Sequence, residues 1–132
     1  MRSPSPVRAR NPLTAGLLSL AGNGMGQLYN GQPGLTALFY GLEAGFMFAT
    51  GMAGLLDSRE GLGVFLGVEL LLKIVAVSQA VLAARARRAY RLRPYNRWQG
   101  YALFYLFALL VTGVVVATSW PPLASLPGLL RP

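Results

Sequence analysis

Three long apolar stretches constrain the fold of this 132-residue chain more than any other feature. They cover residues 33–56, 62–84 and 100–119, and each matches the roughly 20 helical residues needed to cross a bilayer core of about 30 Å. The chain is 54% hydrophobic and only 12% charged, which is too apolar for an average soluble domain. We therefore predict an all-α integral membrane protein with three transmembrane helices.

A short polar loop, residues 57–61, joins the first two stretches. Pro33 stands where a helix can begin without losing a backbone hydrogen-bond donor. The two helices should therefore form a tight antiparallel hairpin.

A fourth apolar stretch, Leu13 to Gly22, is too short to cross a bilayer, because ten helical residues rise only about 15 Å. A polar, glycine-dense run, residues 23–32, follows and should interrupt the helix. We predict a short N-terminal re-entrant or interfacial helix plus a loop over residues 12–32. The alternative is a signal peptide, since arginines precede a short apolar core and Ser19-Leu20-Ala21 resembles a cleavage site.

Arginines gather in two clusters, and the positive-inside rule places both clusters in the cytoplasm. This requires that residues 12–32 do not cross the membrane. The predicted order is a basic cytoplasmic tail (1–11), a membrane domain (12–119) and an outer proline-rich tail (120–132), so the C-terminus is extracytoplasmic. Trp98, Tyr101 and Trp120 fall where interfacial aromatic residues belong. The clusters are Arg2, Arg8 and Arg10 at the N-terminus, and Arg85, Arg87, Arg88, Arg91, Arg93 and Arg97 in the loop 85–99.

The arginine-rich loop also contains Tyr90, Tyr95 and Trp98, a composition found in nucleic-acid-binding segments. The loop lies between two membrane spans, however. Orientation of the chain and contact with anionic lipid headgroups explain the charge, so membrane lipids are predicted as partners and nucleic acid is not.

Three ionisable residues lie within the predicted spans, where a charge is costly. Glu69 precedes Lys73 by four residues, the favourable order for a pair on one helical face. Folding the hairpin about Arg59 brings Glu43 level with residue 75, about one turn from Lys73. We expect Glu43, Glu69 and Lys73 to form an ionic cluster that fixes the register of the two helices. Proton or ion movement and ligand binding are the alternatives.

Glycines recur at the four-residue spacing that permits close packing of membrane helices. By the same fold-back count, Gly51 and Gly54 lie opposite Gly67 and Gly63. We expect packing within the hairpin, with a homodimer face as the alternative. The set comprises Gly41, Gly45, Gly51, Gly54, Gly63 and Gly67. The third span carries an aromatic side that faces lipid or a partner protein, formed by Tyr101, Phe104, Tyr105 and Phe107.

Catalytic constellations are not found. The chain has no Cys and no His, which excludes thiolate and imidazole metal sites, Cys nucleophiles and His bases. Lys73 and Ser78 are five residues apart and point to different sides of a helix, and the single Asp, Asp57, lies in a loop. No phosphate-binding loop is present. We predict that the chain is not an enzyme and uses no metal or cofactor.

Two motifs resemble known bacterial membrane proteins. The Asn11-Pro12 pair, Leu17-Leu18-Ser19-Leu20 and the run Gly24-Met25-Gly26-Gln27-Leu28-Tyr29-Asn30-Gly31-Gln32 are similar to the opening of TM2-like small bacterial membrane proteins and of the multi-span module ahead of some type I signal peptidase domains. Arg93-Pro94-Tyr95-Asn96-Arg97-Trp98 is similar to the second group. Asn23 stands where the motif usually has Pro.

The resemblance implies a bacterial cytoplasmic membrane location and an outer C-terminus, but it carries over no catalytic residue, because no Ser-x-Met nucleophile segment occurs here. Within the re-entrant motif we expect glycines to permit a tight turn and polar side chains to satisfy backbone groups that the turn frees. Its residues are Asn23, Gly24, Gly26, Gln27, Tyr29, Asn30 and Gly31.

We expect a non-enzymatic accessory or scaffold subunit that binds other membrane proteins or copies of itself. Two alternatives stay open. One is a small oligomeric unit that moves protons or ions through Glu43, Glu69 and Lys73. The other is the membrane module of a signal-peptidase-like protease.

Overall fold

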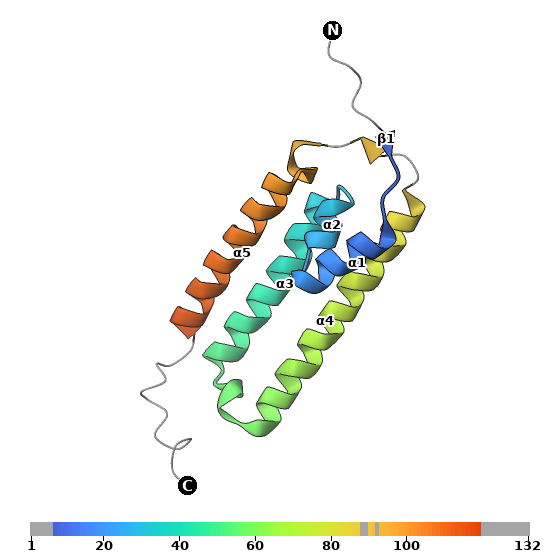
Figure 1. Cartoon of the computed structure of the whole chain (residues 1–132). Helices are drawn as coiled ribbons and strands as arrows, with labels where there is room; N and C mark the ends of the chain where they lie inside the picture. The colour runs from blue at the N-terminus through green and yellow to red at the C-terminus, as the bar shows by residue number, and fades with distance from the viewer. Residues whose placement is uncertain (1–6, 88–89, 92, 120–132) are drawn as a thin grey trace.

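The computed structural model describes residues 7–87, 90–91 and 93–119. The basic residue Arg2, the loop residue Arg88 and the proline-rich tail with Trp120 lie outside this part of the chain. Five helices make up most of the described residues (Figure 1). They are α1 (Pro12–Ala21), α2 (Met25–Tyr29), α3 (Pro33–Met52), α4 (Arg59–Ala86) and α5 (Trp98–Ser119), with the short 3-10 helices η1 (Leu55–Asp57) and η2 (Pro94–Asn96) and the two-residue strands β1 (Val7–Arg8) and β2 (Tyr90–Arg91).

Within the described residues, three helices are long and apolar enough to span a membrane. They are α3, α4 and α5, with 20, 28 and 22 residues, or about 30, 42 and 33 Å at the helical rise. The predicted helical architecture, with three candidate spans and one shorter apolar helix, is confirmed at this level. The first span is shorter than expected, because α3 ends at Met52 rather than at residue 56.

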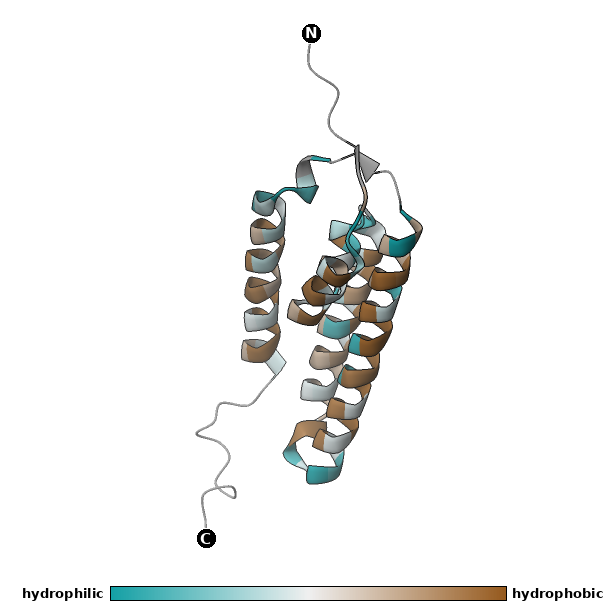
Figure 2. Ribbon diagram, turned by 45° about the vertical axis from the view of Figure 1, so that its right-hand side comes forward, coloured by the Kyte–Doolittle hydropathy of each residue, from teal (hydrophilic) through white to brown (hydrophobic). Residues whose placement is uncertain are grey.

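Burial in this structure is the reverse of burial in a soluble protein. The largest fully buried side chains of the described residues are polar: Gln27, Asn23, Asn30 and Ser19. Large apolar side chains are exposed along every long helix, for example Leu38 on α3, Leu70 on α4 and Leu106 on α5. Hydrophobic residues cover most of the long helices, with hydrophilic residues at the ends and a few within the hairpin helices (Figure 2). Such a surface suits a lipid solvent and would be an aggregation liability in water.

The N-terminal segment and the loop between α4 and α5 lie at the same end of the helices (Figure 1). Strands β1 and β2 pair antiparallel, with Val7 opposite Arg91. The backbone N–H of Arg10 also donates to the carbonyl oxygen of Arg87 at 3.3 Å. The segments that carry the two arginine clusters are therefore hydrogen-bonded to each other at one end of the bundle, and η1 lies at the other end (Figure 1).

Helices α1 and α2 form a broken pair at the end that carries β1 and β2, and they do not reach η1 (Figure 1). The side chain of Asn11 caps α1 by accepting from the N–H of Leu13 at 2.9 Å. Gly24 ends the turn that follows with φ at +90°, a left-handed conformation that favours glycine. The chain therefore enters the bundle, turns and returns to the end from which it started.

The reversal between α3 and α4 lies earlier in the chain than the sequence suggested. The rings of Phe46 and Phe65 stack at 5.6 Å with an interplanar angle of 7°, so these residues stand at one level. Gly54, with φ at +64°, starts the reversal and η1 completes it before α4 begins. The centre of the hairpin is therefore in η1 and not at Arg59. The predicted register is wrong by about two helical turns.

Candidate functional site

The polar residues of the glycine-rich motif form a buried cluster against α4. We call Asn23, Gln27 and Asn30 the amide cluster. The side-chain N–H of Gln27 donates to the backbone oxygen of Ala76 at 2.7 Å and to Gln79 Oε1 at 3.0 Å. The side-chain N–H of Asn30 donates to the backbone oxygen of Ala80, also at 2.7 Å. Gln27 and Asn30 therefore bond to the backbone of another helix, whereas the sequence predicted that they serve their own turn.

A stripe of alanines on α4 lets the amide cluster approach so closely. Ala76, Ala80 and Ala84 recur every four residues and are all buried. On the facing side, a Cβ on Gly26 would overlap Ser19 Oγ and the backbone oxygen of Ala15, and would lie only 2.8 Å from the Ala80 Cβ. Gly26 is therefore required by close approach and not by an unusual φ. The alanine stripe was missed because alanines at this spacing are common in helices.

Tyr29 and Asn96 tie the amide cluster to the arginine-rich end. The Tyr29 hydroxyl accepts from the N–H of Asn11 at 3.1 Å, and the guanidinium carbon of Arg10 lies 4.4 Å from the centre of the Tyr29 ring. The side-chain N–H of Asn96, in η2, donates to the backbone oxygens of Leu28 and Tyr29. Asn96 therefore anchors the loop before α5 onto α2. The sequence contained this residue only as part of the Arg-Pro-Tyr-Asn-Arg-Trp resemblance.

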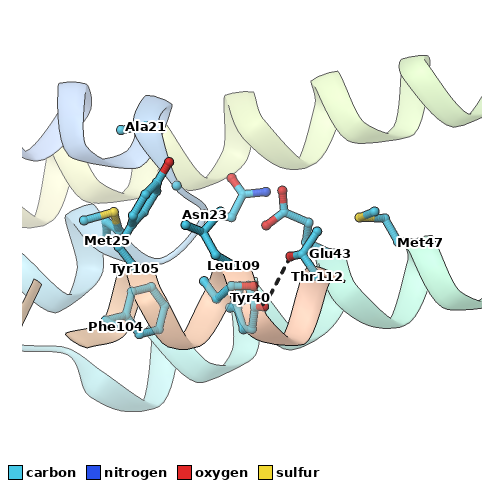
Figure 3. Close-up of a pocket in the computed structure, with 12 residues that line it drawn as sticks. Ala21, Asn23, Met25, Tyr40, Glu43, Met47, Phe104, Tyr105, Leu109 and Thr112 are labelled. Carbon is cyan, nitrogen blue, oxygen red and sulfur yellow. Dashed lines mark hydrogen bonds between the residues drawn. The ribbon is translucent and has the colours of Figure 1, made fainter. Parts of the chain in front are cut away.

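A pocket of about 180 Å³ lies between the α1–α2 turn, α3 and α5. We call it the α3/α5 pocket. Its polar lining includes Asn23 from the turn, Tyr40 and Glu43 from α3 and Thr112 from α5 (Figure 3). The Tyr40 hydroxyl donates to the backbone oxygen of Ala108 at 2.7 Å and so holds α3 against α5. Aromatic and aliphatic side chains form the rest of the wall, chiefly Phe104, Tyr105, Met25, Met47 and Leu109.

Asn23 is the exceptional member of the amide cluster. Its side chain is only 2% exposed, yet neither Oδ1 nor Nδ2 has a hydrogen-bond partner among the described residues. An unsatisfied buried amide of this kind costs about 1–3 kcal/mol. The side-chain amide points toward the carboxylate of Glu43 in the pocket (Figure 3).

The three ionisable residues of the candidate spans lie near one another but do not form the expected ion pairs. Glu69 is within electrostatic reach of both Glu43 and Lys73. Across the described residues, however, no ammonium or guanidinium nitrogen lies within the 4.0 Å ion-pair limit of either carboxylate. Oε1 of Glu69 is buried, and no described residue bonds to it. The corrected hairpin register explains this, because it places Glu43 level with Glu69 and not with Lys73.

Four of the packing glycines face outward, which corrects the expectation that they pack within the hairpin. A Cβ added to Gly41, Gly45, Gly63 or Gly67 would meet no described atom within 4 Å. We call these residues the open glycines. Gly51 is buried near the end of α3, and Gly54 serves the left-handed turn instead of a helix contact.

The remaining predicted residues have simple positions. Gly31 adopts φ at +75° in the turn between α2 and α3. Arg85 lies in the last turn of α4, and Arg87, Arg91, Arg93 and Arg97 lie in or beside the loop that leads to α5. On the aromatic side of α5, Tyr101 faces Tyr29, and Phe104 and Phe107 both face Tyr40. Tyr105 lines the α3/α5 pocket, and Tyr105 and Phe107 are also exposed.

No matching family model, characterised protein or solved structure was found for this chain. The described residues also hold no group of three or more acidic side chains that could bind a metal ion.

Proposed function

We propose that this chain is a non-enzymatic multi-pass membrane protein that acts as an accessory or scaffold subunit of a larger bacterial membrane assembly. The open glycines carry this proposal. Gly41 and Gly45 on α3, and Gly63 and Gly67 on α4, each form an i, i+4 pair with empty space above it. A partner helix can approach the backbone closely at such a pair. Within a membrane, van der Waals packing of this kind drives helix association, because lipid removes the hydrophobic effect between helices.

The amide cluster supports this role by fixing the helices that present the open glycines. Gln27 and Asn30 bond to α4, Thr36 at the start of α3 donates to the backbone oxygen of Gly24 at 3.0 Å, and Asn96 bonds to α2. Four segments are thereby joined at one end of the bundle. A docking surface held this way loses little conformational entropy when a partner binds.

The test uses substitutions that block a partner without disturbing the monomer. Gly45→Leu and Gly67→Leu add bulk where the chain itself has nothing within 4 Å of a Cβ among its described atoms. Each variant should fold normally and lose the proteins that co-purify after mild extraction from the native membrane. The control is Val64→Leu, which enlarges an exposed residue beside Gly63. Retention of the same partners by both glycine variants, or recovery of the wild type only as a free monomer, would refute the proposal.

A second candidate function is proton or ion handling by an oligomer. It is favoured by two carboxylates, Glu43 and Glu69, that act on each other inside candidate spans without an ion-pair partner among the described residues. Intramembrane carboxylates of this kind are typical of ion pathways. Proteoliposome flux that Glu43→Gln leaves unchanged would remove this candidate.

A further inference from the structure

The α3/α5 pocket has polar groups that the described part of the chain leaves without partners. Asn23 stands in the wall, but its Oδ1 and Nδ2 are both fully buried, so an occupant does not reach them in this structure. Glu43 is half-buried and lines the same pocket (Figure 3). A purely apolar occupant, such as a lipid chain, would leave the Glu43 carboxylate desolvated and unpaired. The occupant therefore needs a polar group that can pair with Glu43.

The charge of the neighbouring residues selects a cation. Glu43 and Lys73 each lie within electrostatic reach of Glu69, and no other Asp, Glu, Lys or Arg occurs between Leu62 and Ala84 or within α3. The Glu43 carboxylate has no ion-pair partner among the described residues, so its negative charge lacks an adjacent counter-charge. A low-dielectric surrounding makes such a charge costly until a cation balances it. An anionic occupant would add to the imbalance.

The walls of the pocket favour an organic cation over a metal ion. Glu43 is the single carboxylate among the residues that line it, whereas Ca²⁺ and Mg²⁺ need six or more oxygen ligands. The rings of Tyr40, Phe104 and Tyr105 line the same pocket, with Tyr40 and Phe104 edge to face at 5.7 Å. Aromatic faces attract an ammonium group and also bury its alkyl substituents. An ammonium group with an apolar substituent therefore suits this lining, because the cation pairs with the carboxylate and the substituent packs against the aromatic rings.

The position of the pocket along α3 and its volume limit which ammonium compounds can bind. Glu43 is ten residues beyond Pro33, so it lies about 15 Å along α3 from the arginine-rich end. Lipid headgroups stay near the ends of the spans, so a lipid amine does not reach this level. The volume of about 180 Å³ exceeds that of an engineered cavity of roughly 150 Å³ that holds benzene. The pocket therefore has room for one aryl or short alkyl amine.

We propose that the α3/α5 pocket binds a lipophilic organic ammonium ion, with the Glu43 carboxylate as its counter-ion and the Tyr40 and Phe104 rings against its apolar part. This site uses a different surface from the open glycines. A failed test of ligand binding would therefore leave the proposed scaffold role unaffected, and a failed test of the scaffold role would leave ligand binding unaffected.

Calorimetric titration of the purified protein in a maltoside detergent tests the proposal, with benzylammonium as the probe and benzyl alcohol as its neutral analogue of similar size. The wild type should bind benzylammonium at least tenfold more tightly than benzyl alcohol. Glu43→Gln should remove this preference, while Glu60→Gln, at the exposed start of α4, should retain it. Equal affinity for the two probes, or an unchanged preference in Glu43→Gln, would overturn the proposal.

Two further variants keep the test decisive if Glu43→Gln fails to fold. Phe104→Leu removes an aromatic face and should weaken benzylammonium binding several-fold with little effect on benzyl alcohol. Lys73→Met removes the competing ammonium and should strengthen benzylammonium binding several-fold. An affinity that neither variant changes would contradict the assignment. Displacement of the probe by added phosphatidylethanolamine would also contradict it, because the ligand would then be a lipid headgroup.

Discussion

The side-chain amide of Gln27 donates a 2.7 Å hydrogen bond to the backbone oxygen of Ala76, although the two residues are 49 positions apart in the sequence. Gln27 is fully buried, and its Oε1 also accepts from Ser19 Oγ at 3.3 Å. One side chain thus links α1, α2 and α4. This link is the centre of the fold, because it holds the broken helix against a candidate membrane span.

Replacing Gln27 by Ala should destabilise the protein by about 1–3 kcal/mol, since the Gln27 hydrogen bonds are lost and a buried cavity is left. Thermal unfolding in detergent measures the change. Gln99→Ala, at an exposed position of α5, is the matched control and should leave the melting temperature unchanged. Equal melting temperatures for the two variants would show that the amide cluster does not hold the fold.

Gly26→Ala tests the close approach of α2 to α1 and α4. The added methyl group has no space between Ser19, Ala15 and Ala80, so we expect a loss of about 1–3 kcal/mol from overpacking. Gly34→Ala, where a Cβ would meet no described atom within 4 Å, should be neutral or slightly stabilising in thermal unfolding. A Gly26→Ala variant as stable as Gly34→Ala would contradict the packing described here.

Much of the architecture could be predicted from local sequence signals. The three long helices followed from apolar length, and the break after α1 followed from the glycines and polar residues of the motif. Both signals act within a few residues. The register between α3 and α4 was predicted wrongly because the reversal begins earlier than the sequence indicated. The left-handed Gly54 and η1 form this reversal, whereas the prediction placed most of the same residues in the first helix.

The partners of the site residues were harder to predict, because they depend on contacts between distant parts of the chain. The sequence identified Gln27 and Asn30 but not their bonds to Ala76 and Ala80. It identified the glycine pairs but could not tell an inward face from an outward face, since both sides of α3 and α4 are apolar. Asn23 was identified as part of a turn, and only the structure brings it into one pocket with Glu43.

Glu69→Gln should leave the protein as stable as the wild type or raise its free energy of unfolding by about 0.5 kcal/mol. The substitution removes a like-charge interaction with Glu43 and a weaker attraction to Lys73, and no described residue forms an ion pair with Glu69 that would be lost. Chemical or thermal unfolding in detergent provides the measurement, with Glu60→Gln as the control. A loss of more than about 1 kcal/mol would restore the original prediction of a register-fixing ionic cluster.

We propose that residues 12–32 enter and leave the membrane on one side, so that α3, α4 and α5 make three crossings with both arginine clusters at the same face. The chain contains no Cys, so single-cysteine variants give unambiguous labels. Ala9, which follows β1, and Arg93, which precedes η2, are exposed, and so is Ser58, between η1 and α4. The variants Ala9→Cys, Arg93→Cys and Ser58→Cys therefore place one label at each of these positions.

A membrane-impermeant maleimide applied to sealed, oriented vesicles measures the topology directly. We expect Ala9→Cys and Arg93→Cys to react from the same side and Ser58→Cys to react only from the opposite side. Labelling of Ala9→Cys from the side that labels Ser58→Cys, and not from the side that labels Arg93→Cys, would show instead that residues 12–32 cross the membrane.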